Sequence, residues 1–198
     1  GCLEQRGFPV AELRLLASAR SKGKRFPFAG RELVVEELTH DSFGGIDIAL
    51  FSAGGSISKE FAPSAAAAGA VVIDNSSAFR MDADVPLVVP EINPDAAADR
   101  PRGIIANPNC TTIVSLMALA PLHRRFGLRA VIASSYQAVS GAGAQGIVEL
   151  DEQLEALAAG REFQPRVFAR QIAFNVIPQV DAFTDNGHTT AEMKMQNE

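Results

Sequence analysis

The sequence predicts an α/β fold, with an open, Rossmann-like sheet of nucleotide-binding type up to about residue 109 and part of an α+β arrangement after it. Two observations carry this prediction. Short β-branched runs alternate along the chain with helix-like stretches, an order typical of α/β proteins. Several runs, such as residues 46–51 and 71–73, are almost continuously apolar, as are parallel strands that are covered on both faces.

The individual elements follow from the same patterns. Strands are predicted at residues 32–38, 46–53, 70–75, 87–89, 103–106, 129–136 and 173–178, and an earlier strand starts at Leu13. Helices are predicted at residues 57–68, 111–126 and 146–159, and a further helix-like stretch opens at Thr189 and Thr190. The segment 129–136 fits a second, mixed sheet.

The composition is that of an ordinary globular protein: 198 residues, 47% hydrophobic and 21% charged, with a net charge of −5. High apolar content and low net charge exclude disorder as the main state. Mild acidity without charge blocks argues against nucleic-acid binding, and no apolar run approaches the roughly 18–20 residues of a membrane span. Cys2 and Cys110 form no disulfide framework, which favours the reducing cytoplasm. No Cys/His cluster has metal-ligand spacing, so no metal is predicted.

The strongest local signal is the run Ala-Asn-Pro-Asn-Cys-Thr-Thr at residues 106–112. A strand is expected to end there, Pro108 turns the chain, and Cys110 falls where a helix begins. N–H groups at a helix start carry partial positive charge, which favours a thiolate over a thiol. Cys110 is therefore a candidate nucleophile, with a buried, inert cysteine as the alternative. Cys2, expected inside a helix, has no such setting.

Small residues follow two of the predicted strands. Gln137 comes at the end of the strand at 129–136 and precedes a loop of small residues at 138–143. Residues 51–56 form a similar small-residue turn. Such turns let a flat ring or a phosphate approach the backbone, although a plain strand-to-helix connection explains each of them as well.

Basic side chains stand at two other predicted strand ends. Arg20 and Ser21 follow the first strand and offer donors suited to a ribose 2′-phosphate, or they belong to a solvated basic turn. Arg80 ends the run Asp-Asn-Ser-Ser-Ala-Phe-Arg. It is placed to bind a small oxyanion, unless it forms a surface salt bridge to Asp82 or Asp84.

In order and spacing, these motifs resemble aspartate-semialdehyde dehydrogenase over essentially the whole chain. The matching runs are Ser-Ala-Arg-Ser at 18–21, Asn-Ser-Ser-Ala-Phe-Arg at 75–80, Pro-Glu-Ile-Asn at 90–93, Asn-Pro-Asn-Cys-Thr-Thr at 107–112, Tyr-Gln-Ala-Val-Ser-Gly-Ala-Gly at 136–143, Asn-Val-Ile-Pro at 175–178 and Glu-Met-Lys-Met at 192–195. The resemblance implies an NADP-binding domain at 1–109 and a catalytic and dimerisation domain at 110–198. It also implies a homodimer.

The resemblance implies the following catalytic roles. Cys110 is the nucleophile that forms an acyl thioester, and Gln137 binds the substrate. Arg80 and Lys194 hold phosphate, with Asn109 nearby. The implied reaction interconverts L-aspartate 4-semialdehyde and L-aspartyl 4-phosphate, with NADP and phosphate, in the synthesis of lysine, threonine and methionine.

For the cofactor, the resemblance implies two groups of contacts. Arg20 and Ser21 match the site of the NADP 2′-phosphate. Ser140 and Gly141 match a second cofactor contact.

The chain also departs from the family pattern. The family's first strand and glycine-rich loop would precede Gly1, and its catalytic histidine and carboxylate-binding arginine would follow Glu198. We therefore expect an internal segment that is inactive by itself. Ala191 stands where many relatives carry a carboxylate that holds the substrate amine, a role that would then shift to Glu192.

Two alternatives remain open from the sequence. One is a related reductase of N-acetylglutamyl phosphate, which uses the same kind of nucleophile. The surroundings of Cys110 and Gln137 favour the semialdehyde enzyme. The other is a non-catalytic paralogue with a dinucleotide fold. The presence of Cys110, Gln137 and Arg80 argues against it.

Overall fold

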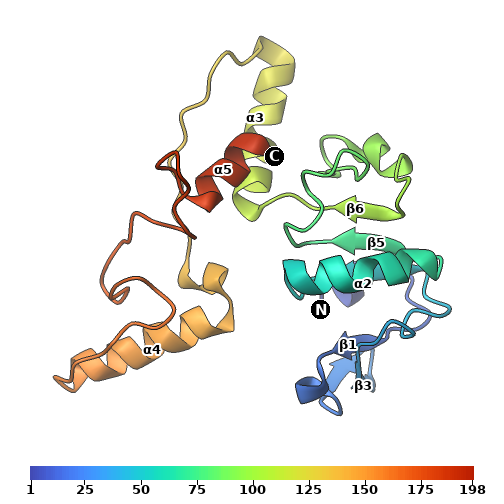
Figure 1. Ribbon diagram of the computed structural model, residues 1–198, viewed down its shortest axis with the longest axis horizontal. Coiled ribbons are helices and arrows are strands. Elements are labelled where there is room, and N and C mark those ends of the chain that lie inside the picture. The colour runs from blue at the N-terminus through green and yellow to red at the C-terminus, as the bar shows by residue number, and fades with distance from the viewer. The chain divides into compact units, whose positions relative to one another are not determined.

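The computed structural model describes residues 1–198 and divides into two compact units, residues 1–113 with Glu198 and residues 114–197. Figure 1 shows the elements along the chain. They are α1 (Cys2–Gln5), β1 (Leu15–Ala17), η1 (Ala19–Ser21), β2 (Arg25–Phe28), β3 (Arg31–Glu37), β4 (Ile48–Phe51), α2 (Gly55–Ala67), β5 (Val71–Asp74), η2 (Pro94–Ala98), β6 (Ile104–Ala106), α3 (Cys110–Phe126), η3 (Val139–Ala142), α4 (Ala144–Ala158) and α5 (Thr190–Asn197), where η marks a 3₁₀-helix.

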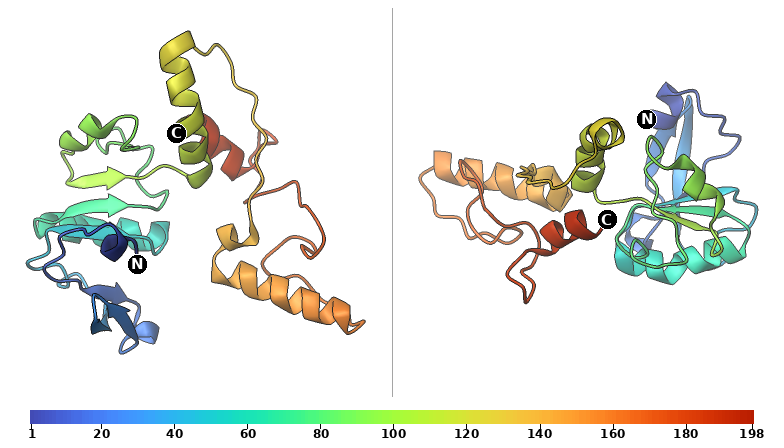
Figure 2. Two further views of the ribbon diagram at one scale, coloured as in Figure 1. Left: turned by 180° about the vertical axis from the view of Figure 1, so that it is seen from behind. Right: turned by 90° about the horizontal axis from the view of Figure 1, so that it is seen from above.

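The first unit contains a parallel sheet in the order β4-β5-β6. Parallel neighbours need a crossover connection, and α2 supplies it between β4 and β5, running alongside the sheet in Figures 1 and 2. Ala62 and Ala65 of α2 are fully buried, because small side chains let the helix lie close to the strands. The core between helix and sheet includes Val72 and Ile104. The predicted α/β class with a parallel sheet is confirmed.

A second three-stranded sheet contains β1, β3 and β2. β1 pairs in parallel with β3, and β2 pairs with β3 in antiparallel register. β2 was not expected from the sequence, because Pro27 interrupts it, and a proline is tolerated only in an edge strand. Its hairpin turn has positive φ at both Ala29 (49°) and Gly30 (73°), which two-residue hairpin loops of this kind require.

Most of the predicted elements are confirmed. The strands expected at 32–38, 46–53, 70–75 and 103–106 correspond to β3, β4, β5 and β6, and the helices at 57–68, 111–126 and 146–159 correspond to α2, α3 and α4. The helix-like stretch after Thr189 is α5. The strand predicted at 87–89 does not form; Leu87 makes only an isolated bridge to Ala106. Cys2 is the first residue of α1, so its expected place inside a helix is wrong.

Two predicted strands of the second unit are wrong. Residues 129–136 form no strand, because no segment of the chain pairs with their backbone, and Ile132 is fully exposed at 101%. The second, mixed sheet expected there is therefore absent. Residues 173–178 are also irregular. There the buried side chain of Gln153 accepts the N–H groups of Ile172 and Ala173 at 2.8 and 3.0 Å, so a side chain replaces a strand partner.

Glu149, one turn before Gln153 on α4, also accepts backbone hydrogen bonds from this irregular segment. Its carboxylate, 1% exposed, accepts the backbone N–H groups of Arg166 at 2.9 Å, Val167 at 2.5 Å and Phe168 at 3.4 Å. Burial alone raises the pKa of Glu149, but these three hydrogen bonds outweigh it and hold the pKa below its ordinary value. Two polar side chains of α4 thus hold an irregular segment next to the helix. Figure 2 shows the backbone of this segment running beside α4.

Candidate active site

The candidate site begins at the carboxyl ends of β5 and β6. Because the two strands are parallel, the residues that follow them lie at the same edge of the sheet. Asn75 follows β5 and Asn107 follows β6. The Asn107 side-chain amide donates to Asn75 Oδ1 at 2.6 Å, so the two loops are linked at the carboxyl edge of the sheet.

Asp74, the last residue of β5, shapes the loop that follows it. Its buried carboxylate accepts hydrogen bonds from Ser58 Oγ at 2.6 Å, Ser76 Oγ at 2.7 Å and the Ser76 N–H at 3.1 Å. Ser76 Oγ in turn accepts the N–H of Ala78 at 3.1 Å. These bonds fix the path of the chain toward Arg80.

Arg80 is buried at this edge. Its Nη2 donates to the carbonyl of Asn75 at 3.2 Å, and its Nη1 pairs with Glu198 Oε1 at 3.0 Å. Its Nε is buried without a partner. The alternative of a surface salt bridge to Asp82 or Asp84 does not hold, because both carboxylates pair with Arg102, at 2.7 and 3.2 Å.

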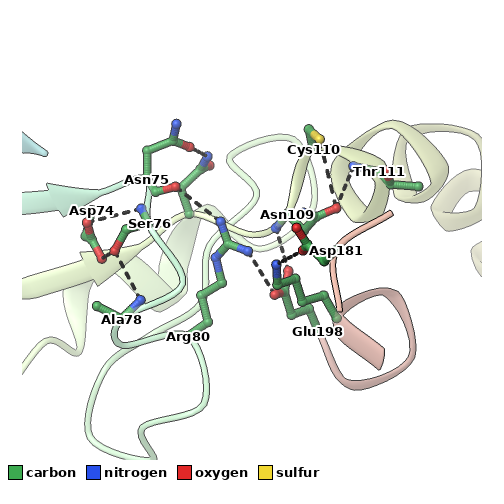
Figure 3. A network of polar contacts seen from close by, with 12 residues as sticks. Asp74, Asn75, Ser76, Ala78, Arg80, Asn109, Cys110, Thr111, Asp181 and Glu198 are labelled. Atoms are coloured by element: carbon green, nitrogen blue, oxygen red, sulfur yellow. Dashed lines mark hydrogen bonds and ion pairs between the residues drawn. The ribbon is translucent and has the colours of Figure 1, made fainter. Parts of the chain in front are cut away.

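Cys110 is the first residue of α3, as the sequence predicts, and its side chain is exposed. Asn109 caps the helix, because its Oδ1 accepts the N–H of Thr111 at 3.0 Å. The same oxygen lies 3.9 Å from the Cys110 Sγ. Glu198 Oε2 accepts the backbone N–H of Asn109 at 2.5 Å. Figure 3 shows the resulting chain of contacts from Asn75 through Arg80 and Glu198 to the start of α3.

Gln137, Ser140 and Gly141 lie together in the second unit, around the 3₁₀ turn that precedes α4. The Gln137 side chain folds back over Gly141. A Cβ at position 141 would stand 2.5 Å from Gln137 Cδ and 2.7 Å from its Cγ, far inside van der Waals contact. Gly141 therefore provides the space that the Gln137 side chain occupies.

α5 carries Lys194 and Glu192. The Lys194 ammonium pairs with Asp181 at 2.8 Å. Glu192 accepts the N–H and the hydroxyl of Thr189 at 2.6 and 2.8 Å, and Thr189 Oγ1 accepts the Glu192 N–H at 3.3 Å. The backbone hydrogen bond from Thr189, above all, lowers the pKa of Glu192. Its carboxylate thus caps α5 as part of a capping box, so a shift of substrate binding from position 191 to Glu192 would require this cap to open.

The residues proposed for a dinucleotide also follow strand ends. Arg20 and Ser21 form η1 directly after β1, and the Arg20 guanidinium makes no hydrogen bond or ion pair. Between β4 and α2, Gly54 has a φ of +96° and precedes helix N–H groups that no side chain caps. A Cβ at Gly55 would meet only Ser77 Oγ, at 3.9 Å. Free donors and an open backbone at these turns fit a phosphate-bearing cofactor.

The sequence-predicted residues thus fall into separate groups. Arg80, Asn109 and Cys110 share one polar network in the first unit, with Arg20 and Ser21 at another strand end. Gln137, Ser140 and Gly141 share one turn in the second unit, and Lys194 lies on α5. Sequence reasoning missed Glu198, because its contact with Arg80 spans 118 residues and leaves no local signal. It also missed the side-chain bond that links Asn75 and Asn107, although both residues lie in the quoted motifs.

No three histidine, cysteine, aspartate or glutamate side chains gather so that they could hold a metal ion. None of the helices has both the length and the apolar character needed to cross a bilayer.

The parallel sheet, with a cysteine and an arginine at its carboxyl edge, defines an α/β protein of the dinucleotide-binding class. Comparison with known proteins extends this. Residues 1–100 match the NAD binding domain of semialdehyde dehydrogenase, and residues 119–198 match the dimerisation domain of semialdehyde dehydrogenase. The chain belongs to the semialdehyde dehydrogenase family.

Individual relatives agree with this assignment. Aspartate-semialdehyde dehydrogenase of Aquifex aeolicus is 55% identical over 98% of this chain and 58% of its own length. The crystal structure of aspartate semialdehyde dehydrogenase II from Vibrio cholerae, complexed with ASA, superposes with a TM-score of 0.95 at 52% identity, over 98% of this chain and 58% of that one. A Candida albicans aspartate semialdehyde dehydrogenase with NADP gives a TM-score of 0.53 at 28% identity, over 64% and 43%. The chain thus spans somewhat more than half the length of its first relatives.

Proposed function

We propose that this chain provides much of the active site of an NADP- and phosphate-dependent enzyme that interconverts L-aspartate 4-semialdehyde and L-aspartyl 4-phosphate. The observation that carries the proposal is the exposed Cys110 thiol at the first position of α3, in the same polar network as the buried Arg80. A nucleophile and an anion-binding cation at one sheet edge suit acyl transfer to phosphate. Relatives named for aspartate semialdehyde, at 55% identity, favour this substrate over N-acetylglutamyl phosphate.

The proposed reaction starts at Cys110. Its thiolate adds to the aldehyde carbon and forms a hemithioacetal. NADP, when bound, would supply the hydride acceptor. Loss of the hydride from that carbon, and of the hydroxyl proton to solvent, would leave a thioester on Cys110. A phosphate oxygen then attacks the thioester carbon, releasing aspartyl 4-phosphate and restoring the thiolate. The covalent intermediate divides one difficult step into two easier ones.

The other side chains position the reactants. Gln137, held over Gly141, would orient the acyl group. Arg80 and Lys194 would hold the phosphate, with Asn109 fixing the start of the helix that carries the nucleophile. For Lys194 this requires the ammonium to exchange or share its present partner, Asp181.

Arg20 and Ser21 support NADP as the preferred cofactor. No carboxylate lies in η1 to bind a ribose 2′-hydroxyl, and the Arg20 guanidinium is free to bind a 2′-phosphate. Ser140 and Gly141 would provide the second contact. Residues 1–109 would then form the NADP-binding domain and residues 110–198 the catalytic and dimerisation part of a cytoplasmic homodimer, serving lysine, threonine and methionine synthesis.

The proposal is tested with the full-length protein, by following NADPH formation from aspartate semialdehyde with and without inorganic phosphate. We expect turnover that requires phosphate. The 198-residue chain by itself is the matched comparison and should show none. Failure of the full-length protein to reduce NADP under these conditions would leave a non-catalytic paralogue as the better account.

A further inference from the structure

The carboxylate of Glu198 joins the two halves of the polar network in the first unit. One oxygen pairs with Arg80 Nη1 at 3.0 Å, and the other accepts the backbone N–H of Asn109 at 2.5 Å. Both side chains are buried, with 7% of Arg80 and 3% of Glu198 exposed. Figure 3 shows the carboxylate between the guanidinium and the cap of α3. Glu198 therefore fixes the distance between Arg80 and the helix that begins with Cys110.

Glu198 leaves Arg80 with unused donors. An arginine carries five N–H groups. Nη1 and Nη2 each donate to one acceptor, while Nε is buried without any partner. An unpaired buried donor is costly unless another group binds there. The guanidinium is thus held by one carboxylate and one carbonyl, and its remaining N–H groups are available to a second anion.

We propose that Glu198 is a positioning residue, which holds Arg80 and the Asn109 backbone so that Arg80 presents its free donors to an oxyanion beside Cys110. The inference rests on the proposed function, because it takes Arg80 as the phosphate-binding arginine. In the opposite role, the Glu198 carboxylate would occupy the anion-binding position on Arg80 and would have to leave before an anion could bind. The structure favours positioning, because departure of Glu198 would break its bond to the Asn109 N–H as well as the ion pair.

The test compares Glu198→Gln with the unmodified full-length protein. Glutamine keeps the shape but removes the charge that holds the guanidinium. We expect the dissociation constant for inorganic phosphate, measured by calorimetry, to rise about tenfold, and the KM for phosphate to rise with it while the KM for NADP stays unchanged. A general loss of folding would not separate the two KM values. Asp82→Asn, which removes a carboxylate from Arg102 in the same unit, is the matched control and should change neither.

A double-mutant cycle shows whether Glu198 acts through Arg80. In an Arg80→Ala background, Glu198→Gln should change phosphate binding less than twofold. Glu198→Asp, which keeps the charge but is one methylene shorter, should recover only part of the affinity. If Glu198→Gln folds poorly, the same cycle is run with Glu198→Asp.

Three results would overturn the inference: unchanged or tighter phosphate binding in Glu198→Gln, an equal loss with and without Arg80, or parallel changes in both KM values. Each of these leaves the turnover of the unmodified enzyme intact, so the proposed function would stand. Absence of phosphate binding and turnover in the unmodified protein would instead reject the proposed function, and the positioning role with it.

Discussion

Gly141 lies directly beneath the side chain of Gln137, and any side chain at position 141 would occupy the volume that Gln137 fills. Gly141 lies in η3, the 3₁₀ turn before α4, and Gln137 precedes that turn by two residues. Gln137 is the flexible partner, because its amide end and not the backbone blocks the space. Packing of the Gln137 side chain is therefore a sufficient reason for a glycine at position 141, whether or not a cofactor also approaches it.

Gly141→Ala should displace the Gln137 side chain and lower kcat by about ten- to hundredfold, the cost of a small misplacement at a reacting group. The measurement is kcat with saturating substrates in the full-length protein. In a Gln137→Ala background the same substitution should cost little further activity, because there is no amide left to displace. Equal losses in both backgrounds would show that Gly141 acts by another contact.

Arg80→Ala should raise the KM for phosphate ten- to hundredfold with little change in the KM for NADP, since charge-assisted hydrogen bonds contribute about 1.5–3 kcal/mol. The variant should also unfold more easily, because it leaves the Glu198 carboxylate buried without its cation. Arg102→Ala is the control, as Arg102 pairs with Asp82 and Asp84 instead. An unchanged phosphate KM in Arg80→Ala would remove Arg80 from the anion site.

Arg20→Ala should reduce kcat/KM for NADP about ten- to hundredfold and leave kcat/KM for NAD nearly unchanged, because only NADP carries the 2′-phosphate. Arg25→Ala, whose guanidinium already pairs with Glu32 at 2.6 Å, serves as the control. If the unmodified enzyme uses NAD and NADP with equal kcat/KM, the assignment of η1 to the 2′-phosphate is wrong.

Glu149 should make the stability of the second unit depend on pH. Because its pKa is lower in the folded chain than its ordinary value of 4.5, its ionised form stabilises the fold. That contribution is complete above about pH 4.5 and is lost as the pH falls through the folded pKa. Glu149→Gln should therefore lower the free energy of unfolding by about 1.5–3 kcal/mol at pH 7.

Urea unfolding of both proteins at a series of pH values measures this effect, and the difference between them should shrink as the pH falls below 4.5. Asp151→Asn, at an exposed position on the same helix, should change stability little. A Glu149→Gln effect that is constant with pH would mean that the lost interaction does not depend on the carboxylate charge.

The sequence predicted the parallel sheet well, because buried parallel strands are nearly continuous apolar runs and α2 and α3 follow them at clear turns. It predicted poorly where backbone pairing is decided by distant residues. Residues 129–136 have strand-like composition but no partner backbone. At 166–173, the N–H groups bind Glu149 and Gln153, which from the sequence alone are polar residues of an amphipathic helix.

The same limit applies to the candidate site. The places of Cys110 at a helix start and of Arg20 just after a strand end follow from local sequence, and both are found in the structure. The partner of Arg80 could not be predicted, because nearby Asp82 and Asp84 were equally plausible and Glu198 is 118 residues away. Cys2 was also misplaced: it too begins a helix and is exposed, so it is a competing thiol in any labelling experiment.

Covalent catalysis at Cys110 is the central claim, and one measurement addresses it directly. Full-length protein carrying Cys2→Ser is mixed with NADP and aspartate semialdehyde without phosphate, quenched in acid and mapped by peptide mass spectrometry. We expect a burst of NADPH of up to one equivalent per active site and an aspartyl thioester on the peptide that contains Cys110, which disappears when phosphate is added before the quench. Cys110→Ser should keep the fold but show neither burst nor adduct. A burst without acyl label on Cys110, or substantial turnover by Cys110→Ser, would contradict the claim.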